Sequence, residues 1–345
     1  MQPVKIVDLF AGPGGLDVAA EKLGIPTVGV EWDAGACATR RAADLKTVEG
    51  DVRDYGPADF PEADVLAGGP PCQTFTVAGN GAGRRALDDV LAFVKRMVAR
   101  EDRELIAEDL AKLKDERTGL VLEPLRWVLE AIDARERPYQ AIVLEQVPAV
   151  LPVWEAFAEA LAGEGYSADY GILRTEEFGV PQTRKRAVLI ARRSEDAPSL
   201  PTPTHRPYRK GVPRDMGDPN RLPWTTMSDV LDRRAPFVVI SNYGTGGDPK
   251  ARGRRRSDEP SATVTGKISR NRVVTPDDTE LERFSDHEAG QLQTFPGDYP
   301  WSGRDVSQQI GNAVPPRLAM HVLSAAFGWD PPSEAALKSL LTWRD

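Results

Sequence analysis

The 345-residue sequence is poor in cysteine and histidine, with two cysteines, Cys37 and Cys72, and three histidines. Two cysteines cannot form the disulfide framework that is typical of small secreted domains, and they fit a chain that stays in the reducing cytoplasm. No cluster of cysteine and histidine has the spacing of zinc ligands, so no metal site is predicted.

Long apolar runs are also missing from the sequence. A membrane-spanning helix needs about 20 consecutive apolar residues, so no membrane association is predicted. The N-terminus starts with a strand-like segment, PVKIVDLF, and not with a basic stretch before an apolar core, so it shows no export signal. These absences predict a globular chain, long enough for one large domain and a second, smaller one.

The formal net charge of −8, taken alone, argues against a nucleic-acid partner. The charge is unevenly distributed, however, because residues 200–275 hold 15 Lys and Arg against 7 Asp and Glu, which makes this segment +8. A solvated loop would also carry such charges, so the segment indicates nucleic-acid binding only together with other signals. Its basic cluster contains Lys250, Arg252, Arg254, Arg255 and Arg256.

The N-terminal residues 4–33 have the pattern of a strand, a glycine turn, a helix and a second strand. Gly12, Gly14 and Gly15 would let backbone N–H groups approach a ligand closely, and Glu31 ends the second strand, where it can bind a ribose diol. The G-x-G-G pattern differs from the dinucleotide fingerprint and suits a nucleoside-containing cofactor without a pyrophosphate. Many such units carry glycines for packing alone, so this signal is weak by itself.

Three further residues lie at or near the ends of expected strands. Phe10 and Trp32 either stack on a purine or pack in the core. Asp51, after a third expected strand, either accepts from an exocyclic amine or caps a helix. The residues alone leave these alternatives open.

The segment VLAGGPPCQTFTVAGN contains an expected buried strand that Pro70 and Pro71 stop. Cys72 follows on a turn at the carboxyl end of that strand, the edge where ligands bind in open α/β sheets. A lone cysteine in this place is a candidate nucleophile, with Gln73 and Thr76 as polar neighbours. The alternative is a cysteine that acts as a small buried hydrophobe.

Beyond this loop, residues 86–113 are predicted to form one or two amphipathic helices. The segment AIVLEQVP predicts a buried strand that ends in Glu145 and Gln146. In PQTRKR, Arg184 and Arg186 are two residues apart, so both point the same way if the chain is extended.

Several separated motifs together resemble one family, the DNA (cytosine-5) methyltransferases, chiefly those of bacterial restriction-modification systems. They occur in the order of that family and span almost the whole chain: DLFAGPGG, GGPPCQTFTVAG, DERTGL, LEQVP, PQTRKR, LQTFP and QIGNAVPP. One motif alone would be weak, but the ordered set is specific. The resemblance implies an α/β fold, with a Rossmann-like methyltransferase sheet covered by helices on both faces and a smaller, irregular, β-containing target-recognition domain.

The resemblance also implies a division of the chain. Residues 1–196 would form the catalytic, cofactor-binding domain, with the helical stretch 86–113 inserted after the catalytic loop. Residues 197–300 would form the target-recognition domain. Residues 301–345 would return to the catalytic domain and end in a long helix.

The implied cofactor is S-adenosylmethionine. The family positions that line its site fall on Phe10, Gly12, Gly14, Leu16, Glu31, Trp32, Asp51, Val52, Pro71, Leu120 and Asn312. The implied partner is double-stranded DNA, contacted by Gln73, Thr76 and the basic cluster at 250–256. A cognate restriction endonuclease would be a functional partner, and the chain itself is expected to be a monomer.

The catalytic route implied by the resemblance is covalent. The Cys72 thiolate would add to carbon 6 of a flipped-out cytosine, and carbon 5 would then attack the sulfonium methyl. Glu145 would hold ring nitrogen 3 and the exocyclic amine, which needs a carboxyl group able to donate a proton. Arg186 would bind the carbonyl at carbon 2, and Arg184 would support the site. Cys37, on an expected helix, is predicted to be a core residue.

Three features depart from the family pattern. Gln146 stands where the family has asparagine, Gln291 stands where an arginine is common, and the stretch 86–113 is inserted. Two other functions stay open. One is cytosine methylation in RNA, because one branch of the family acts on RNA; the other is DNA binding by a catalytically weak member of the family, which the Gln146 change and the insertion would explain. The presence of Cys72 and Glu145 favours the enzyme, and the separate basic segment favours duplex DNA.

Overall fold

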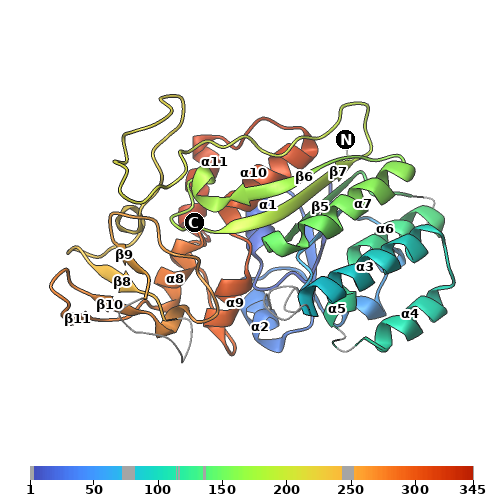
Figure 1. Cartoon of the computed structure of the whole chain (residues 1–345), viewed down its shortest axis with the longest axis horizontal. Coiled ribbons are helices and arrows are strands. Elements are labelled where there is room, and N and C mark those ends of the chain that lie inside the picture. The colour runs from blue at the N-terminus through green and yellow to red at the C-terminus, as the bar shows by residue number, and fades with distance from the viewer. Residues whose placement is uncertain are drawn as a thin grey trace.

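The computed structural model of the chain describes residues 4–71, 82–113, 115, 117–134, 137–242 and 252–344. Two sheets organise these residues, a large one of seven strands and a small one of four strands at one end of the molecule (Figure 1). The mixed order of helices and strands confirms the predicted α/β fold class.

The large sheet has the strand order β3-β2-β1-β4-β5-β7-β6. Its strands are β1 (Ile6–Leu9), β2 (Thr27–Glu31), β3 (Thr47–Glu49), β4 (Val65–Gly68), β5 (Ala141–Gln146), β6 (Ser167–Arg174) and β7 (Lys185–Arg192). The first five strands pair in parallel, whereas β7 runs antiparallel to both of its neighbours. The carboxyl ends of β1, β2, β4 and β5 therefore meet at one edge of the sheet.

Apolar residues run without interruption through the central strands because both faces of the sheet are covered. In β5, Ile142 and Leu144 point into one core, while Ala141 and Val143 point into the other. The first core lies under α3 (Ala82–Val98), α6 (Glu123–Asp133) and α7 (Leu151–Gly163), and the second under α1 (Gly15–Lys22) and α10 (Pro316–Phe327).

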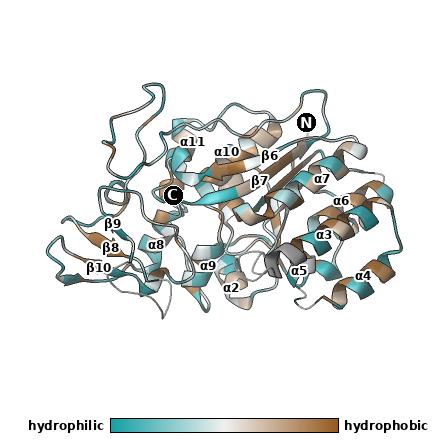
Figure 2. Cartoon of the chain, in the orientation of Figure 1, coloured by the Kyte–Doolittle hydropathy of each residue, from teal (hydrophilic) through white to brown (hydrophobic). Residues whose placement is uncertain are grey.

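The predicted helical stretch 86–113 is a pair of helices, α3 and α4 (Arg103–Ala111), and α3 already begins at Ala82. Both helices carry hydrophobic and hydrophilic residues (Figure 2). Helix α3 separates them onto two faces, as expected of an amphipathic helix, whereas α4 separates them only weakly. Phe93 of α3 and Ile106 of α4 are buried in the first core. The stretch predicted from the sequence to be an insertion is thus part of the helical layer over the sheet.

The small sheet is antiparallel, with the strand order β11-β10-β8-β9. Its strands are β8 (Val238–Ile240), β9 (Arg254–Arg256), β10 (Arg272–Val274) and β11 (Glu280–Leu281). A core of its own, which includes Phe237 and Phe284, lies against it. We refer to the described residues between 227 and 284 as the small-sheet unit.

Five shorter helices complete the described structure. They are α2 (Ala34–Ala42), α5 (Arg117–Leu120), α8 (Asp286–Leu292), α9 (Val306–Asn312) and α11 (Glu334–Lys338). Helices α8 and α9 lie between the small sheet and the large one (Figure 1). Ile310 of α9 packs in the core of the small-sheet unit, while α9 also contacts α2. The division at residues 197 and 300 stays a prediction.

Within the described ranges, no helix combines the length and the apolar content that a membrane span requires.

Candidate active site

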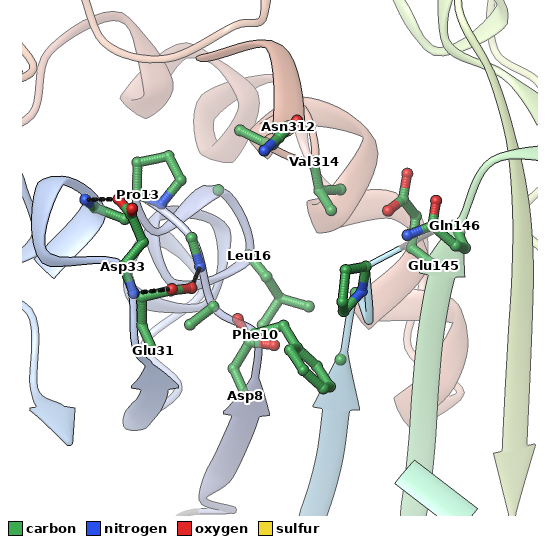
Figure 3. A pocket seen from close by; sticks show the side chains of 18 of the residues that line it. Asp8, Phe10, Pro13, Leu16, Glu31, Asp33, Glu145, Gln146, Asn312 and Val314 are labelled. Carbon is green, nitrogen blue, oxygen red and sulfur yellow. Dashed lines mark hydrogen bonds between the residues drawn. The ribbon is translucent and has the colours of Figure 1, made fainter. Parts of the chain in front are cut away.

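A cavity of about 640 Å³ opens at the edge of the large sheet where β1, β2, β4 and β5 end (Figure 3). Residues of α9 and the start of α10 line its other side. Ligands of open α/β folds bind beyond the carboxyl ends of the strands, so the cavity lies where the topology predicts a site.

Ten of the eleven residues predicted to bind the cofactor line this cavity. They are Phe10, Gly12, Leu16, Glu31, Trp32, Asp51, Val52, Pro71, Leu120 and Asn312. The fold thus brings together residues from both ends of the chain. Their contact with a cofactor stays a prediction.

Gly14 is the remaining one, and it is not among the described residues that line the cavity. It precedes α1 with a φ of 103°, in the left-handed region that favours glycine. A Cβ atom there would collide with the side chain of Leu45 and lie 3.1 Å from the Tyr299 hydroxyl. The structure therefore gives Gly14 a packing role under the start of α1.

The Glu31 carboxylate holds the glycine turn in place. It accepts hydrogen bonds from the backbone N–H groups of Gly12 at 2.7 Å, Trp32 at 2.9 Å and Asp33 at 2.7 Å (Figure 3). Burial raises the pKa of Glu31, and the hydrogen bonds from these donors oppose the rise. Each carboxylate oxygen can accept more than one hydrogen bond, so Glu31 can still accept one from a ligand.

The two aromatic residues at the strand ends differ in their surroundings. Trp32 exposes 68% of its surface and lines the cavity, which excludes the core-packing alternative for this residue. Phe10 is half-buried and packs against the first core, and it also lines the cavity. An exposed tryptophan at a cavity is suited to stacking on a flat ring.

The Asp51 carboxylate both caps a helix and faces the cavity. It caps the 3-10 turn Val52–Asp54 by accepting from the Arg53 N–H at 2.9 Å. The Arg53 guanidinium also donates to it, with an Nη2–Oδ2 distance of 2.6 Å, and this side-chain hydrogen bond is the main reason why the pKa of Asp51 is lowered. The two alternatives drawn from the sequence, a helix cap and an acceptor that faces a ligand, are therefore compatible.

A buried charge cluster beneath the glycine turn was not predicted from the sequence. Arg40 and Asp17 form a bidentate ion pair, with distances of 2.7 Å and 2.9 Å, and both side chains are almost inaccessible to solvent. Asp8 lines the cavity (Figure 3), and its carboxyl group interacts with that of Asp17 and with the Arg40 guanidinium. Burial, followed by the charge of Asp17, raises the pKa of Asp8 well above its usual value. No local motif signals this cluster, because its members come from three different elements.

The lining of the cavity is rich in carboxyl groups. They belong to Asp8, Glu31, Asp33, Asp51, Glu145 and Asp305, whereas Arg53, Arg117 and Arg186 supply the guanidinium groups. Of these, Asp305 has a φ of 53°, a conformation that is uncommon outside glycine. An acidic lining with an exposed tryptophan fits a cationic ligand that carries a nucleoside, as S-adenosylmethionine does.

Glu145, near the end of β5, and Arg186, at the start of the adjacent antiparallel strand β7, face each other at the cavity. Arg186 Nε lies 2.6 Å from Glu145 Oε1, both side chains are mostly buried, and both residues line the cavity. A Cβ atom on Gly69 would lie 3.8 Å from Glu145 Oε2, which is ordinary van der Waals contact, so the carboxylate does not require a glycine at this position. Pro71 lines the same cavity, and Cys72, which follows it, lies outside the described residues.

The departure at Gln146 has a structural consequence. Its amide Nε2 donates a hydrogen bond to the Pro70 carbonyl, and its Oε1 accepts from the Val147 N–H at 2.5 Å. The amide thus joins the end of β5 to the proline turn that follows β4. Gln291 is half-buried in α8.

Arg184 lies behind the cavity and is not among the described residues that line it. Its guanidinium is almost fully buried and donates to the carbonyl groups of Val264 at 2.8 Å, Gly311 at 2.9 Å and Ala313 at 3.3 Å. Burial, and then the charge of Arg186, lowers its pKa well below the usual value. The geometry fits a supporting position and not contact with a substrate.

The structure describes only some of the residues predicted to contact DNA. Gln73, Thr76 and Lys250 lie outside the described residues. Arg254 and Arg256 form ion pairs with Asp278 and Asp258. Arg255 stacks over the Tyr208 ring with a distance of 4.7 Å to its centroid, and Arg252 is half-exposed. DNA contact by these residues stays a prediction.

Cys37 is fully buried in α2, as expected of a core residue, and its Sγ lies 3.4 Å from the Glu31 carbonyl oxygen. Burial raises its pKa to about 11, so its thiol stays protonated at neutral pH. In the part of the chain that the structure describes, no group of three or more His, Cys, Asp or Glu side chains has the geometry of a metal site.

A family model described as C-5 cytosine-specific DNA methylase matches residues 4–327. Among curated proteins, the chain is similar to Type II methyltransferase M1.HphI of Haemophilus parahaemolyticus, with 27% identity over 93% of this chain and 86% of that protein. It is also similar to Type II methyltransferase M.Sau96I of Staphylococcus aureus, with 27% identity over 92% of this chain and 74% of that protein.

Two solved structures share the fold. The Dnmt2 methyltransferase of S. pombe superimposes with a TM-score of 0.64 at 16% identity and covers 94% of this chain and 98% of its own. The methyltransferase EhMeth of Entamoeba histolytica superimposes with a TM-score of 0.62 at 14% identity, covering 95% of this chain and 99% of its own.

Proposed function

The chain belongs to the C-5 cytosine-specific DNA methylase family, and on this premise we propose that it methylates carbon 5 of a flipped-out cytosine in a specific duplex DNA sequence. It is a methyltransferase that uses S-adenosylmethionine, which supplies the methyl group as an electrophilic sulfonium when bound. The curated relatives favour a role in a type II restriction-modification system, with a cognate restriction endonuclease as functional partner.

The first task of the protein is to expose and activate the base. A cytosine inside a stacked duplex cannot be reached, so it must be flipped into the cavity. The Cys72 thiolate then forms a bond to carbon 6, which makes carbon 5 nucleophilic. Carbon 5 would then take the methyl group as the bond between that group and the sulfonium sulfur breaks. A base would remove the proton from carbon 5, and the electrons of that carbon–hydrogen bond would expel the Cys72 thiolate from carbon 6 to release the product.

Glu145 and Arg186 hold the pyrimidine during these steps. Glu145 contacts ring nitrogen 3 and the exocyclic amine, and Arg186 donates to the carbonyl at carbon 2. In the structure Arg186 Nε and Glu145 Oε1 are 2.6 Å apart. The base must therefore insert between the two side chains, or replace their contact with contacts of its own to each of them. Arg184 supports the arrangement from behind.

The observation that carries the proposal is the shared cavity. The Glu145–Arg186 pair, the proline turn before Cys72 and ten of the predicted cofactor residues all line it. A reacting base and a methyl donor would therefore be held side by side, which is the positioning that such a reaction needs.

The test is to express the chain in a bacterial host without cytosine methylation and to sequence the host DNA after bisulfite treatment. We expect one recognition sequence to be protected. A duplex of that sequence with 5-fluorocytosine at the target should form a covalent adduct with the wild-type protein in the presence of cofactor. Cys72→Ser should form none, and Glu145→Gln should lower the rate by about 10²- to 10⁴-fold.

The matched control is Cys37→Ser, which changes the buried cysteine of α2 and should leave adduct formation intact. An assay of methyl transfer to matched duplex DNA and RNA separates the alternatives. Methylation of the RNA but not of the DNA would favour the RNA methyltransferase alternative. Tight DNA binding without any adduct would favour the catalytically weak alternative.

A further inference from the structure

Two glutamines form a buried pair between the large sheet and the small-sheet unit. Gln182 and Gln293 are both fully buried, and the Gln182 amide Nε2 donates to Gln293 Oε1. Gln182 lies in the segment that leads into β7, and Gln293 follows α8. A buried amide is tolerated only when its polar atoms are paired, so its remaining partners matter.

Each remaining polar atom of the pair reaches a different segment. Gln182 Nε2 donates to the Leu292 carbonyl at 3.0 Å, and its Oε1 accepts from the Val264 N–H at 3.0 Å. Gln293 Nε2 donates to the carbonyl groups of Ile310 at 2.7 Å and Ala313 at 3.3 Å. The two amides thus connect the approach to β7, the small-sheet unit, the end of α8 and the end of α9.

The backbone reinforces this connection beside the pair. The Thr183 N–H donates to the Ser261 carbonyl at 2.9 Å, and the Ser261 N–H donates to the Pro181 carbonyl at 2.9 Å. Thr263 Oγ1 donates to the Thr183 carbonyl at 2.7 Å. The small-sheet unit is therefore joined directly to the segment that carries Arg184 and Arg186.

The connected segments carry the two halves of the proposed site. Arg186 is four residues after Gln182 and faces the cavity, while the basic residues of β9 lie a few residues before Ser261. Arg184 donates to Val264 and Gly311 within the same buried region. A shift of the pair would move the DNA-facing unit relative to the pocket for the base.

We propose that Gln182 and Gln293 are positioning residues that set the register between the small-sheet unit and the Glu145–Arg186 pair. The inference rests on the proposed function, since it assumes that the small-sheet unit reads DNA and that the Glu145–Arg186 pair holds the base. Neither glutamine is among the described residues that line the cavity, so the pair acts through its neighbours and not on the cofactor.

The test uses Gln182→Met and Gln293→Met in the full chain, because methionine keeps the length of glutamine and removes the amide. Misplacement by about 1 Å can lower turnover by about 100-fold, and we expect kcat on the recognition duplex to fall to that extent. The ratio of kcat/KM between that duplex and one with a single base change should also fall. The Kd of Gln182→Met for S-adenosylmethionine should stay within about threefold of the wild-type value. The loss of kcat in the double variant, expressed as a free energy, should be no greater than the sum of the losses in the two single variants.

The control is Tyr166→Phe, which removes another buried hydrogen bond, the one from the Tyr166 hydroxyl to the Tyr139 carbonyl at 2.8 Å. This hydrogen bond lies wholly within the large-sheet layers. The Tyr166→Phe variant should therefore be less stable, but it should keep the kcat/KM ratio between the recognition duplex and the duplex with a single base change. If the folded glutamine variants match Tyr166→Phe in kcat and in the discrimination ratio, the positioning role is wrong.

A distance measurement separates this inference from the proposed function. Spin labels at Glu104→Cys in α4 and Asp277→Cys beside β10 would be placed in a Cys72→Ser background, where Cys37 is buried. We expect one narrow distance distribution with the native glutamines and a broad one with Gln182→Met. Equal widths would overturn the positioning role, even if the wild-type protein methylates DNA, and a broadened distribution would support it even if no methylation is found.

Discussion

Trp32 lies at the cavity with most of its side chain exposed. It is a large aromatic residue that exposes 68% of its surface, and it stands directly after Glu31, whose carboxylate shapes the glycine turn. Burying such a side chain is normally favourable, so its exposure at a cavity suggests that a ligand covers it.

Trp32→Ala should weaken binding of S-adenosylmethionine. Stacking of a base on an aromatic side chain contributes about 1–3 kcal/mol, so we expect Kd from titration calorimetry to rise by about 5- to 150-fold. The unfolding temperature without cofactor should hardly change, because the side chain is exposed. Trp329→Ala, another exposed tryptophan that stacks on Phe327, is the control and should leave Kd unaltered.

Asp8 shows how the buried charge cluster couples stability to pH. Its pKa is raised by burial and by Asp17, so the folded state holds a proton at Asp8 more tightly than the unfolded chain does. The resulting contribution to the free energy of unfolding is complete below the ordinary pKa of 3.8. It is lost as the pH rises through the raised value of the folded state.

Asp8→Asn should therefore flatten the alkaline side of the stability profile. Asparagine keeps the shape and can donate a hydrogen bond to Asp17, but it has no charge to bury. Urea unfolding between pH 5 and pH 8 without cofactor should show a smaller loss of stability with rising pH in the variant than in the wild type. Asp88→Asn, on the exposed side of α3, should follow the wild-type profile, and an identical profile for Asp8→Asn would contradict the expectation.

At the scale of elements, α3 and α4 extend the helical layer over the large sheet. Their inner faces supply Phe93 and Ile106 to the first core. Ion pairs also connect the turn between the two helices to the neighbouring helices. Arg100 pairs with Asp133 of α6 at 2.7 Å and with Glu164, just after α7, at 2.9 Å. The pair of helices is thus part of the packed core, and α3 contacts α5, whose Leu120 lines the cavity.

Phe93→Ala should destabilise the whole chain by about 3–5 kcal/mol, since it removes a buried aromatic side chain and leaves a cavity. Leu105→Ala in α4 is the matched control, because Leu105 is 45% exposed and its loss should change stability by about 0.5 kcal/mol or less. Chemical denaturation of both variants measures the difference. Equal effects would mean that α3 does not contribute to the core as its burial indicates.

At the scale of the molecule, the charge is divided between an acidic body and a basic segment. The chain carries −8 overall, although residues 200–275 carry +8. Several arginines of this segment pair with acidic neighbours at the surface, as Arg256 does with Asp258 at 2.7 Å. Exposed ion pairs contribute little to stability, so phosphate groups can replace the acidic partners at small cost.

DNA binding should accordingly weaken steeply with salt. Arg252→Ala and Arg256→Ala should each reduce the slope of log K against log salt concentration by about one if each residue contacts a phosphate. Arg137→Ala is the control, because Arg137 pairs with Asp64 at the opposite edge of the large sheet and should leave the slope unchanged. Fluorescence anisotropy with a labelled duplex measures all three, and a flat salt dependence of the wild type would contradict the predicted role of the basic segment.

The order of motifs along the chain was enough to predict much of the protein. The alternation of short apolar runs, glycine turns and helical periodicity predicts the parallel sheet, and strand ends at Glu31 and Gln146 coincide with those of β2 and β5. These features are local, since each depends on a few consecutive residues. The glycine turn was predicted for the same reason, whereas the nucleophile turn at Cys72 lies outside the described residues and stays a prediction.

Only the tertiary structure decided which residues meet. It placed Gly14 in a packing position, Arg184 behind the cavity, and Trp32 in solvent and not in the core. The Arg40–Asp17 pair and the Gln182–Gln293 pair join residues 23 and 111 positions apart. Gln182 and Gln293 lie in the motifs PQTRKR and LQTFP, but neither motif shows that the two side chains meet. Burial and pairing depend on the packing of segments that are distant in the chain.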